Sequence, residues 1–286
     1  MVRPDTTAKP IGENVAGLDL TDDVTVFVST VGAPSYEACL DHLRRQDCGF
    51  RFELIDYVAP LSAAFQQMLD CCTTPFYVQV DEDMLLLPHA VRSLYERIAA
   101  TDDGVAIYVC LLWDVHLERC ITGVKIFRHS IVRQYPLRDV EGCEWDQVRR
   151  LQRDSFSMLR LSPESATRTS AETLGYHGTH WTPRAIYERY CGLERTRCKG
   201  NRTHDWLFDY PAIFLDRYLC RGDPLDLYAL MGLIAGRLAN HHEIGREKDY
   251  RTYDKLPGHD SIYRYLDEVT NASYEDLIDS DEPGPN

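Results

Sequence analysis

The hydrophobic positions in the first hundred residues follow two alternating patterns. Continuous runs of β-branched and aromatic residues are typical of strands buried on both faces. Apolar residues that recur every three to four positions are typical of helices. The runs predict strands at 24–30, 50–58 and 75–80, and the spacing predicts helices at 36–46, 60–72 and 87–100. Ser35 is expected to cap the first helix. Three successive strand–helix pairs indicate an α/β fold with an open, mostly parallel sheet.

The remainder of the chain is less regular. Further strands are predicted at 104–113 and 122–132, a helix at 144–159, and mainly helical structure from residue 206 to about 266. The first residues are rich in Pro, Thr and Asp, and the last ones are acidic without a basic residue. We therefore expect four parts, namely a flexible arm at 1–23, an α/β domain at 24–203, a helical C-terminal extension at 204–270 and an acidic tail at 271–286.

Composition narrows the classes of partner. The formal net charge of -14 disfavours general nucleic-acid binding, because an acidic surface repels phosphate backbones. The N-terminus lacks the apolar segment of a signal peptide, and the longest apolar run, 227–236, is about half of a membrane span. Ten scattered cysteines without a CxxC pair predict reduced thiols. We expect a cytoplasmic protein with no membrane span.

Three consecutive carboxylates, Asp81, Glu82 and Asp83, directly follow the third predicted strand. In open α/β sheets, ligands bind at the carboxyl ends of strands. As the extended chain leaves the strand, Asp81 and Asp83 project to one side, where they can share Mg2+ or Mn2+ and a diphosphate. Alternatively, Asp83 caps the helix that follows.

The segments "VTVFVST", "ELIDYV", "AAFQQMLDCC" and "PFYVQVDEDMLLLPHAV" resemble the nucleotide-sugar half of the GT-A glycosyltransferases, in a family-2-like form. The resemblance implies a GT-A fold, a DxD motif, a divalent metal, a nucleoside-diphosphate sugar as donor and a hydroxyl-bearing acceptor. It also implies that Asp83 binds the metal and that Asp81 contacts the ribose or the sugar. Asp56 would then read the base, and Thr30 would lie against the nucleoside.

The downstream segment from Thr122 to Asp154 is similar to the acceptor side of the same fold. This similarity makes Glu144 and Asp146 the candidates for the general base that an inverting transferase needs. The alternative is that both acids merely place negative charge at a helix N-terminus.

The segment "GYHGTHWTPRA" contains two histidines, His177 and His180. Several metal-dependent GT-A families complete their metal site with a histidine from this region, so the resemblance makes either one a candidate ligand. An imidazole suits Mn2+ better than Mg2+. The spacing also permits a helical pair that binds zinc alone, and a purely structural role remains the other alternative.

Residues 184–202 reverse the local charge, with six basic residues against two acidic ones. A flexible basic loop that closes over the donor would stabilise the diphosphate leaving group, with Arg184 as the first contact. A solvated helix face and a site for an anionic acceptor are the alternatives.

A metal-dependent phosphohydrolase is the main rival to a glycosyltransferase. Its metal cluster would come from histidines and aspartates of the C-terminal half, namely His204, Asp205, His241, His242, His259 and Asp260. That hypothesis leaves Asp81 and Asp83 without a role. A nucleotidyltransferase would need a better Gly-rich loop than "STVGAPS", and a binding module without activity is a third alternative. The sequence thus favours a metal-dependent transferase that moves a sugar to a hydroxyl group.

Overall fold

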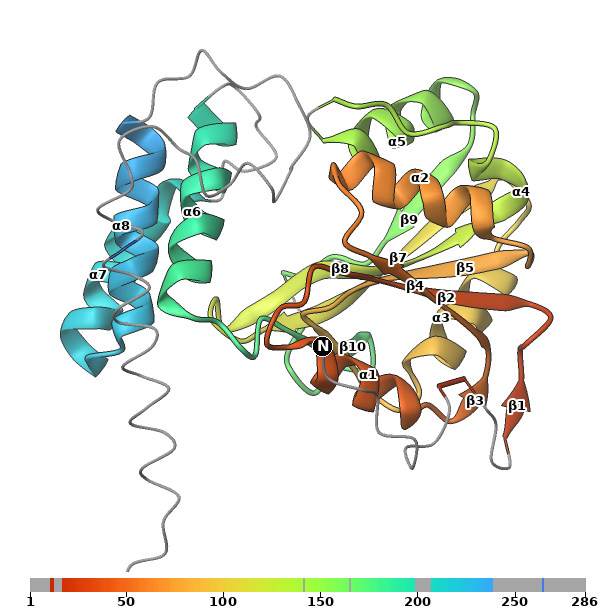
Figure 1. Cartoon of the computed structure of the whole chain (residues 1–286), viewed down its shortest axis with the longest axis horizontal. Coiled ribbons are helices and arrows are strands. Elements are labelled where there is room, and N and C mark those ends of the chain that lie inside the picture. The colour runs from red at the N-terminus through yellow and green to blue at the C-terminus, as the bar shows by residue number, and fades with distance from the viewer. Residues whose placement is uncertain are drawn as a thin grey trace, which may run out of the picture. The chain divides into compact units, whose positions relative to one another are not determined.

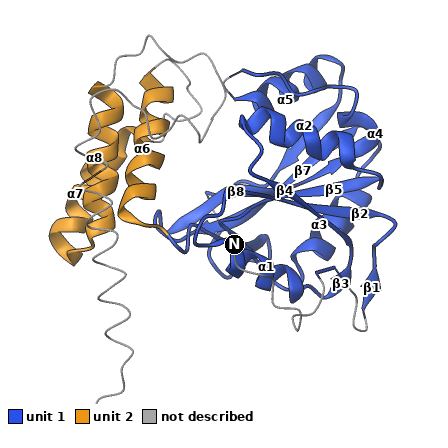
Figure 2. Cartoon of the chain, viewed as in Figure 1, with its two compact units in different colours: residues 1–180, 246–249 blue, residues 181–245, 250–286 orange. Residues whose placement is uncertain are grey.

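The computed structural model describes residues 11–12, 17–140, 142–164, 166–198, 207–238 and 264. The chain divides into two compact units, Met1–His180 with Arg246–Asp249, and Trp181–Gly245 with Tyr250–Asn286 (Figure 2). The boundary at 203/204 that the sequence suggests stays a prediction, because residues 203 and 204 lie outside the described part. The acidic tail at 271–286 also lies outside it.

The described part of the first unit contains an eight-stranded sheet in the order β4-β2-β5-β8-β7-β10-β6, with β9 beside β7 (Figure 1). Its strands are β2 (Val24–Thr30), β4 (Arg51–Asp56), β5 (Phe76–Asp81), β6 (Met84–Leu86), β7 (Val105–Asp114), β8 (Arg119–Arg128), β9 (Ser157–Arg160) and β10 (Thr173–His177). Two strands, β6 and β8, run against the others. The short strands β1 (Leu18–Asp19) and β3 (Cys48–Gly49) form a separate parallel pair.

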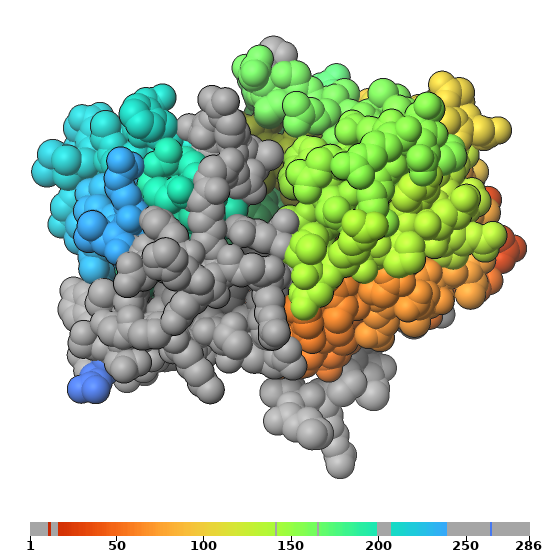
Figure 3. All heavy atoms as spheres, turned by 90° about the horizontal axis from the view of Figure 1, so that it is seen from above, coloured from red at the N-terminus to blue at the C-terminus, as the bar shows by residue number. Residues whose placement is uncertain are grey.

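Helices cover both faces of this sheet (Figure 1). They are α1 (Tyr36–Arg44), α2 (Leu61–Cys71), α3 (Ala90–Ala99), α4 (His129–Val132) and α5 (Cys143–Arg153). Val24, Val26 and Val28 of β2 pack on the face of α1 and α3, whereas Phe27 packs on the face of α2, α4 and α5. Figure 3 shows this second face from outside, with the orange and light-green surfaces of residues near α2 and α5. Burial on both faces explains the continuous apolar runs.

The described part of the second unit consists of α6 (Pro183–Cys198), α7 (Tyr210–Arg221) and α8 (Pro224–Leu238), besides a 3-10 turn. Two glycines let α8 pack closely on α6. A Cβ at Gly232 would lie 2.4 Å from the carbonyl oxygen of Tyr187, and one at Gly236 would lie 2.4 Å from that of Cys191. No helix in the described residues is long and apolar enough to cross a membrane.

These observations confirm the predicted α/β class with a mostly parallel sheet and a mainly helical C-terminal part. Two local predictions are wrong. The helix predicted at 144–159 ends at Arg153, since Ser155 adopts a φ of 69° before β9 begins. Ser35 occupies the cap position of α1, but its side chain makes no capping hydrogen bond.

The prediction of a flexible basic loop at 184–202 is also wrong, because residues 184–198 belong to α6. Ile186, Tyr187, Tyr190 and Cys191 are buried at helical spacing, so the amphipathic pattern dominates over the charge. Lys199 and Arg202 lie outside the described residues.

All ten cysteines lie in the described part and are free, and seven of them are buried. Burial raises the pKa of the thiols of Cys39, Cys48 and Cys110 to about 12. These three side chains therefore stay protonated near neutral pH and act as small apolar residues.

Candidate active site

We call residues 81–83, at the end of β5, the acidic turn. Hydrogen bonds hold its middle carboxylate, that of Glu82, in place. Glu82 is only 8% exposed, and it accepts hydrogen bonds from Thr30 Oγ1 at 2.5 Å, Val31 N at 2.9 Å and Ala33 N at 2.8 Å. These contacts attach the loop after β2 to the turn after β5. Glu82 therefore fixes the position of the strand ends through the loop after β2.

Asp81 is the last residue of β5 and lies where three strands meet. Its carboxylate accepts a hydrogen bond from Ser29 of β2 at 2.9 Å. Burial and the nearby Asp83 raise the pKa of Asp81, and the charge of Lys125 on β8 opposes this shift. The carboxylate is thus positioned between the turn and the lysine.

Asp83 lies against a histidine that is itself oriented by a third residue. Its Oδ2 is 3.2 Å from Nε2 of His177, and Nδ1 of the same imidazole is 2.9 Å from Oδ2 of Asp114. Asp114 is 1% exposed and also accepts a hydrogen bond from Leu117 N at 2.7 Å. An ionised carboxylate only accepts hydrogen bonds, so with Asp114 ionised the donor of this contact is Nδ1–H. Metal-binding histidines commonly use this carboxylate–imidazole arrangement, with the other nitrogen directed at the metal.

The donor set fits a divalent cation of the manganese type. A carboxylate oxygen and an imidazole nitrogen converge from β10 and the β5–β6 turn, and both are accepted ligands of Mn2+. Within the described residues, no group of three or more His, Cys, Asp or Glu side chains could hold a metal ion. A cation between Asp83 and His177 would therefore complete its coordination with phosphate oxygens or water, as Mg2+ and Mn2+ commonly do.

Two of the alternatives from sequence do not fit this geometry. Asp83 does not cap a helix, because β6 follows the turn and α3 begins at Ala90 with His89 at the cap position. His177 ends a strand, so it forms no helical zinc pair with His180. His180 is exposed, and its Nδ1 lies 2.8 Å from Thr179 Oγ1.

The predicted nucleoside contacts lie on the neighbouring strand ends. Thr30 and Asp56 are paired in the parallel register of β2 and β4. Thr30 is buried and uses its hydroxyl on Glu82, whereas Asp56 is exposed. Tyr57 is 60% exposed at a φ of 51°, and its hydroxyl lies 2.2 Å from where a Cβ on Gly32 would be. The tyrosine thus lies over the glycine loop beside Asp56.

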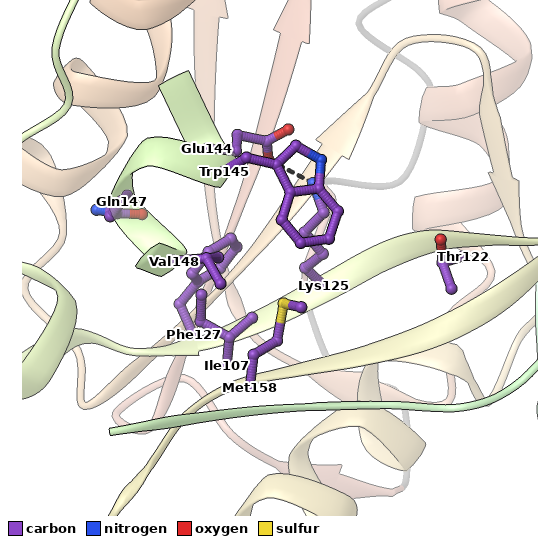
Figure 4. Close-up of a pocket in the computed structure, with 9 residues that line it drawn as sticks. All are labelled: Ile107, Thr122, Lys125, Phe127, Glu144, Trp145, Gln147, Val148 and Met158. Atoms are coloured by element: carbon purple, nitrogen blue, oxygen red, sulfur yellow. Dashed lines mark hydrogen bonds and ion pairs between the residues drawn. The ribbon is translucent and has the colours of Figure 1, made fainter. Parts of the chain in front are cut away.

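A pocket of about 170 Å³ lies between the sheet and α5 (Figure 4). Lys125 of β8 forms an ion pair with Glu144 in the first turn of α5, and both side chains line the pocket. Burial pushes the pKa of Lys125 down, but Glu144 and Asp81 outweigh it and hold this pKa above its usual value. Lys125 therefore links Asp81 electrostatically to the pocket.

The two downstream carboxylates have different surroundings. Asp146 forms ion pairs with Arg150 at 2.9 Å and Arg138 at 3.8 Å. Glu144 lines the pocket with Trp145, whereas Asp146 does not. The structure thus separates the two candidate bases, since Glu144 lines this pocket and Asp146 does not.

Arg184 belongs to the second unit, and its Nε lies 2.9 Å from Oε1 of Glu188. Its predicted contact with a diphosphate stays a prediction. The histidines and aspartates of the rival phosphohydrolase, from His204 to Asp260, lie outside the described residues.

Sequence reasoning missed three residues of this site, namely Asp114, Lys125 and Tyr57. Asp114 directly follows the predicted strand at 104–113, so the rule applied to Asp81 would have found it. Lys125 is a single charge inside the apolar segment "TGVKIF", and buried lysines require partners. Tyr57 has a weaker signal, because only its position after Asp56 marks it.

Comparisons with known proteins find structures with a similar fold at low sequence identity. No protein-family model matches the chain, and no curated protein sequence matches it. Among solved structures, the mannosyltransferase PcManGT from Pyrobaculum calidifontis, in complex with GDP-Man and Mn2+, is similar at 14% identity and a TM-score of 0.48. The match covers 81% of this chain and 90% of that one.

Two further solved structures are more distant. Glucosyl-3-phosphoglycerate synthase from Mycobacterium tuberculosis is similar at 11% identity and a TM-score of 0.39, over 56% of this chain and 73% of that one. A 4-diphosphocytidyl-2C-methyl-D-erythritol synthase from Anaerococcus prevotii is similar at 7% identity and a TM-score of 0.37, over 53% and 94%. Similarity at this level assigns neither a family nor an activity to the chain.

Proposed function

We propose that the protein is a metal-dependent glycosyltransferase that moves a sugar from a nucleoside-diphosphate sugar to a hydroxyl group. The observation that carries this proposal is the pairing of Asp83 with His177, which Asp114 orients, at the end of the sheet where Asp81 also lies. A cation site formed by only two side chains suits a ligand that brings its own phosphate oxygens. The sequence resemblance to the GT-A glycosyltransferases supports the same function.

In this proposal Asp83 and His177 hold Mn2+ or Mg2+, and His180 does not take part. When bound, the cation compensates the charge that develops on the leaving diphosphate. Asp81 contacts the ribose or the transferred sugar. Asp56, which is exposed at the end of β4, hydrogen-bonds the base, and Thr30 lies against the nucleoside.

Glu144 is the proposed general base of an inverting reaction. Its carboxylate takes the proton of the acceptor hydroxyl, whose oxygen forms a bond to the anomeric carbon. The bond from that carbon to the diphosphate oxygen breaks, and the nucleoside diphosphate leaves with the electron pair. Lys125 holds the carboxylate in the pocket before the acceptor arrives, because the ion pair fixes its side-chain conformation.

A thermal-shift experiment with Mn2+ and UDP, GDP, ADP, CDP and dTDP tests the proposal. A nucleotide at about 100 times its Kd stabilises the folded state by about 2.7 kcal/mol, or roughly 5 °C or more at this size. We expect such a shift for at least one nucleotide, only with metal, and its loss in Asp83→Ala. The absence of any metal-dependent shift would contradict the proposal.

The same experiment separates the rival phosphohydrolase. Metal binding that survives Asp83→Ala but is lost in Asp205→Ala would favour a metal site in the C-terminal half. The proposed transferase predicts the opposite pattern for the two variants.

A further inference from the structure

The pocket beside Glu144 has one wall of apolar side chains from four elements. Ile107 comes from β7, Phe127 from β8, Met158 from β9 and Val148 from α5. Trp145, also from α5, is 39% exposed, and in Figure 4 its indole lies above Met158 and next to Lys125. An occupant can therefore contact one large aromatic surface and a flexible thioether.

The size of the pocket limits its occupant. A cavity of about 150 Å³ holds one benzene molecule in another protein. At about 170 Å³, this pocket has room for a single six-membered ring. A larger ligand would extend out of it.

The charged groups limit the occupant further. Lys125 and Glu144 neutralise each other in their ion pair, and Asp81 lies close enough to influence Lys125. An anionic ring would meet the carboxylate of Glu144, and a cationic one would lose water against an apolar wall. A neutral ring can instead bury one face and donate a hydroxyl hydrogen bond to Glu144.

We infer that this pocket binds the acceptor, and that the acceptor carries its reactive hydroxyl on an uncharged six-membered ring with an apolar face. The ring stacks on Trp145 and rests on Met158, with its hydroxyl directed at the carboxylate of Glu144. The inference rests on the proposed function, since it places the ring where Glu144 takes the proton. Both a phenol and the apolar face of a sugar ring have this chemistry.

Ligand titration of the full chain tests this inference, with phenol and methyl β-D-glucopyranoside as ring probes. Benzoate serves as an anionic ring and glycerol as an acyclic polyol, and ligand-observed NMR measures each Kd. We expect one or both ring probes to bind at least tenfold more tightly than benzoate and glycerol. Tighter phenol binding identifies an aromatic acceptor, and tighter glucoside binding identifies a sugar. Equal binding of all four probes, or binding of none, would overturn the inference.

Neighbouring residues of β9 provide the matched control. Met158 lines the pocket, whereas Leu159 is 41% exposed and does not. We expect Met158→Ala and Trp145→Ala each to raise the Kd of the ring probe at least tenfold, and Leu159→Ala to leave it within twofold. An unchanged Kd in both pocket variants would place the probe elsewhere and refute the assignment.

Nucleotide binding keeps this result separate from the proposed function. If Mn2+ and a nucleoside diphosphate bind but no ring probe does, the acceptor inference fails alone. If ring probes bind at Trp145 and no nucleotide binds with metal, the pocket stands as a ring site, while its role as an acceptor site fails together with the proposed function.

Discussion

The acidic turn after β5 and the start of α5 both carry carboxylates two positions apart, but they present them differently. At the turn, Asp81 and Asp83 interact electrostatically with each other, and Glu82 between them bonds to the loop after β2. Glu82 and Asp83 form the short turn between β5 and β6, so the connection keeps both aspartates at the same end of the sheet.

In a helix, side chains two positions apart point in different directions. Two positions correspond to a rotation of about 200° at 3.6 residues per turn. Glu144 therefore reaches Lys125 and the pocket, whereas Asp146 reaches Arg150 on another side of α5. The two regions differ in the partners of their acids. Glu82 binds backbone amides and Asp146 binds an arginine four residues along the helix, whereas Asp83 contacts an imidazole and Glu144 contacts a lysine of a distant strand. We expect only the second kind of partner to mark a chemical site.

The largest expected effect comes from Asp83→Asn compared with Glu82→Gln. Asp83→Asn should weaken Mn2+-dependent nucleotide binding at least a hundredfold in calorimetry, because it removes the charged one of the two protein ligands proposed for the metal. Glu82→Gln should keep this affinity within a few fold. It should instead lower the free energy of unfolding by about 1–3 kcal/mol, since an amide nitrogen would face backbone donors. A greater loss of affinity in Glu82→Gln would reverse the assignment of the turn.

The second effect distinguishes the acids of α5. With an active donor, Glu144→Gln should lower kcat by roughly 10²–10⁴-fold, which is the typical contribution of a general base. Asp146→Asn should leave kcat within twofold. It should destabilise the fold by only about 0.5 kcal/mol, because its ion pair with Arg150 joins residues four positions apart on one helix. Comparable kcat values for both variants would remove Glu144 from the proposed reaction.

A smaller effect is expected from Asp114→Asn, which leaves Asp83 and His177 in place. An amide can no longer fix the imidazole through a charged hydrogen bond, and loss of such a support commonly costs 10–100-fold in metal affinity. Mn2+ titration followed by EPR measures this loss. His180→Gln is the control, and an affinity that falls for it but not for Asp114→Asn would favour the other histidine.

The smallest effect concerns Glu194 on α6, a structural carboxylate like Asp146. Burial pushes the pKa of Glu194 up, but the hydrogen bonds and charge of Arg197 outweigh it and hold this pKa below the usual 4.5. The resulting stabilisation is present above pH 4.5 and is lost as the pH falls through the folded-state pKa. Thermal melts between pH 6 and 3 should show a steeper decline for the native chain than for Glu194→Gln; parallel declines would show that the pair contributes nothing.

The sequence predicted the regular half of the fold because burial on both faces leaves a direct signal. The apolar runs of β2 and β5 are buried on both faces, as expected for strands of a covered sheet, so the position of Asp81 at a strand end followed. Short segments carried less signal. β9 follows α5 after a turn of few residues, so its first residues were included in the helix predicted at 144–159.

The sequence named candidate site residues only where one segment contained the information. Sequence could not choose between His177 and His180, because the choice depends on the pairing of β10 with β6 and β7, which brings His177 to Asp114. Likewise, Glu144 and Asp146 have the same local context, and only Lys125 from a distant strand distinguishes them. Such tertiary pairings lie between segments and leave no local pattern.

Pulsed EPR of Mn2+ bound with the nucleoside diphosphate tests the central claim most directly, because it detects nuclei coordinated to the metal. The account predicts coupling to phosphorus and to one imidazole nitrogen, with the nitrogen coupling lost in His177→Gln and retained in His180→Gln. Nitrogen coupling that persists without His177, or a Mn2+ signal with no imidazole at all, would contradict a metal site formed by Asp83 and His177.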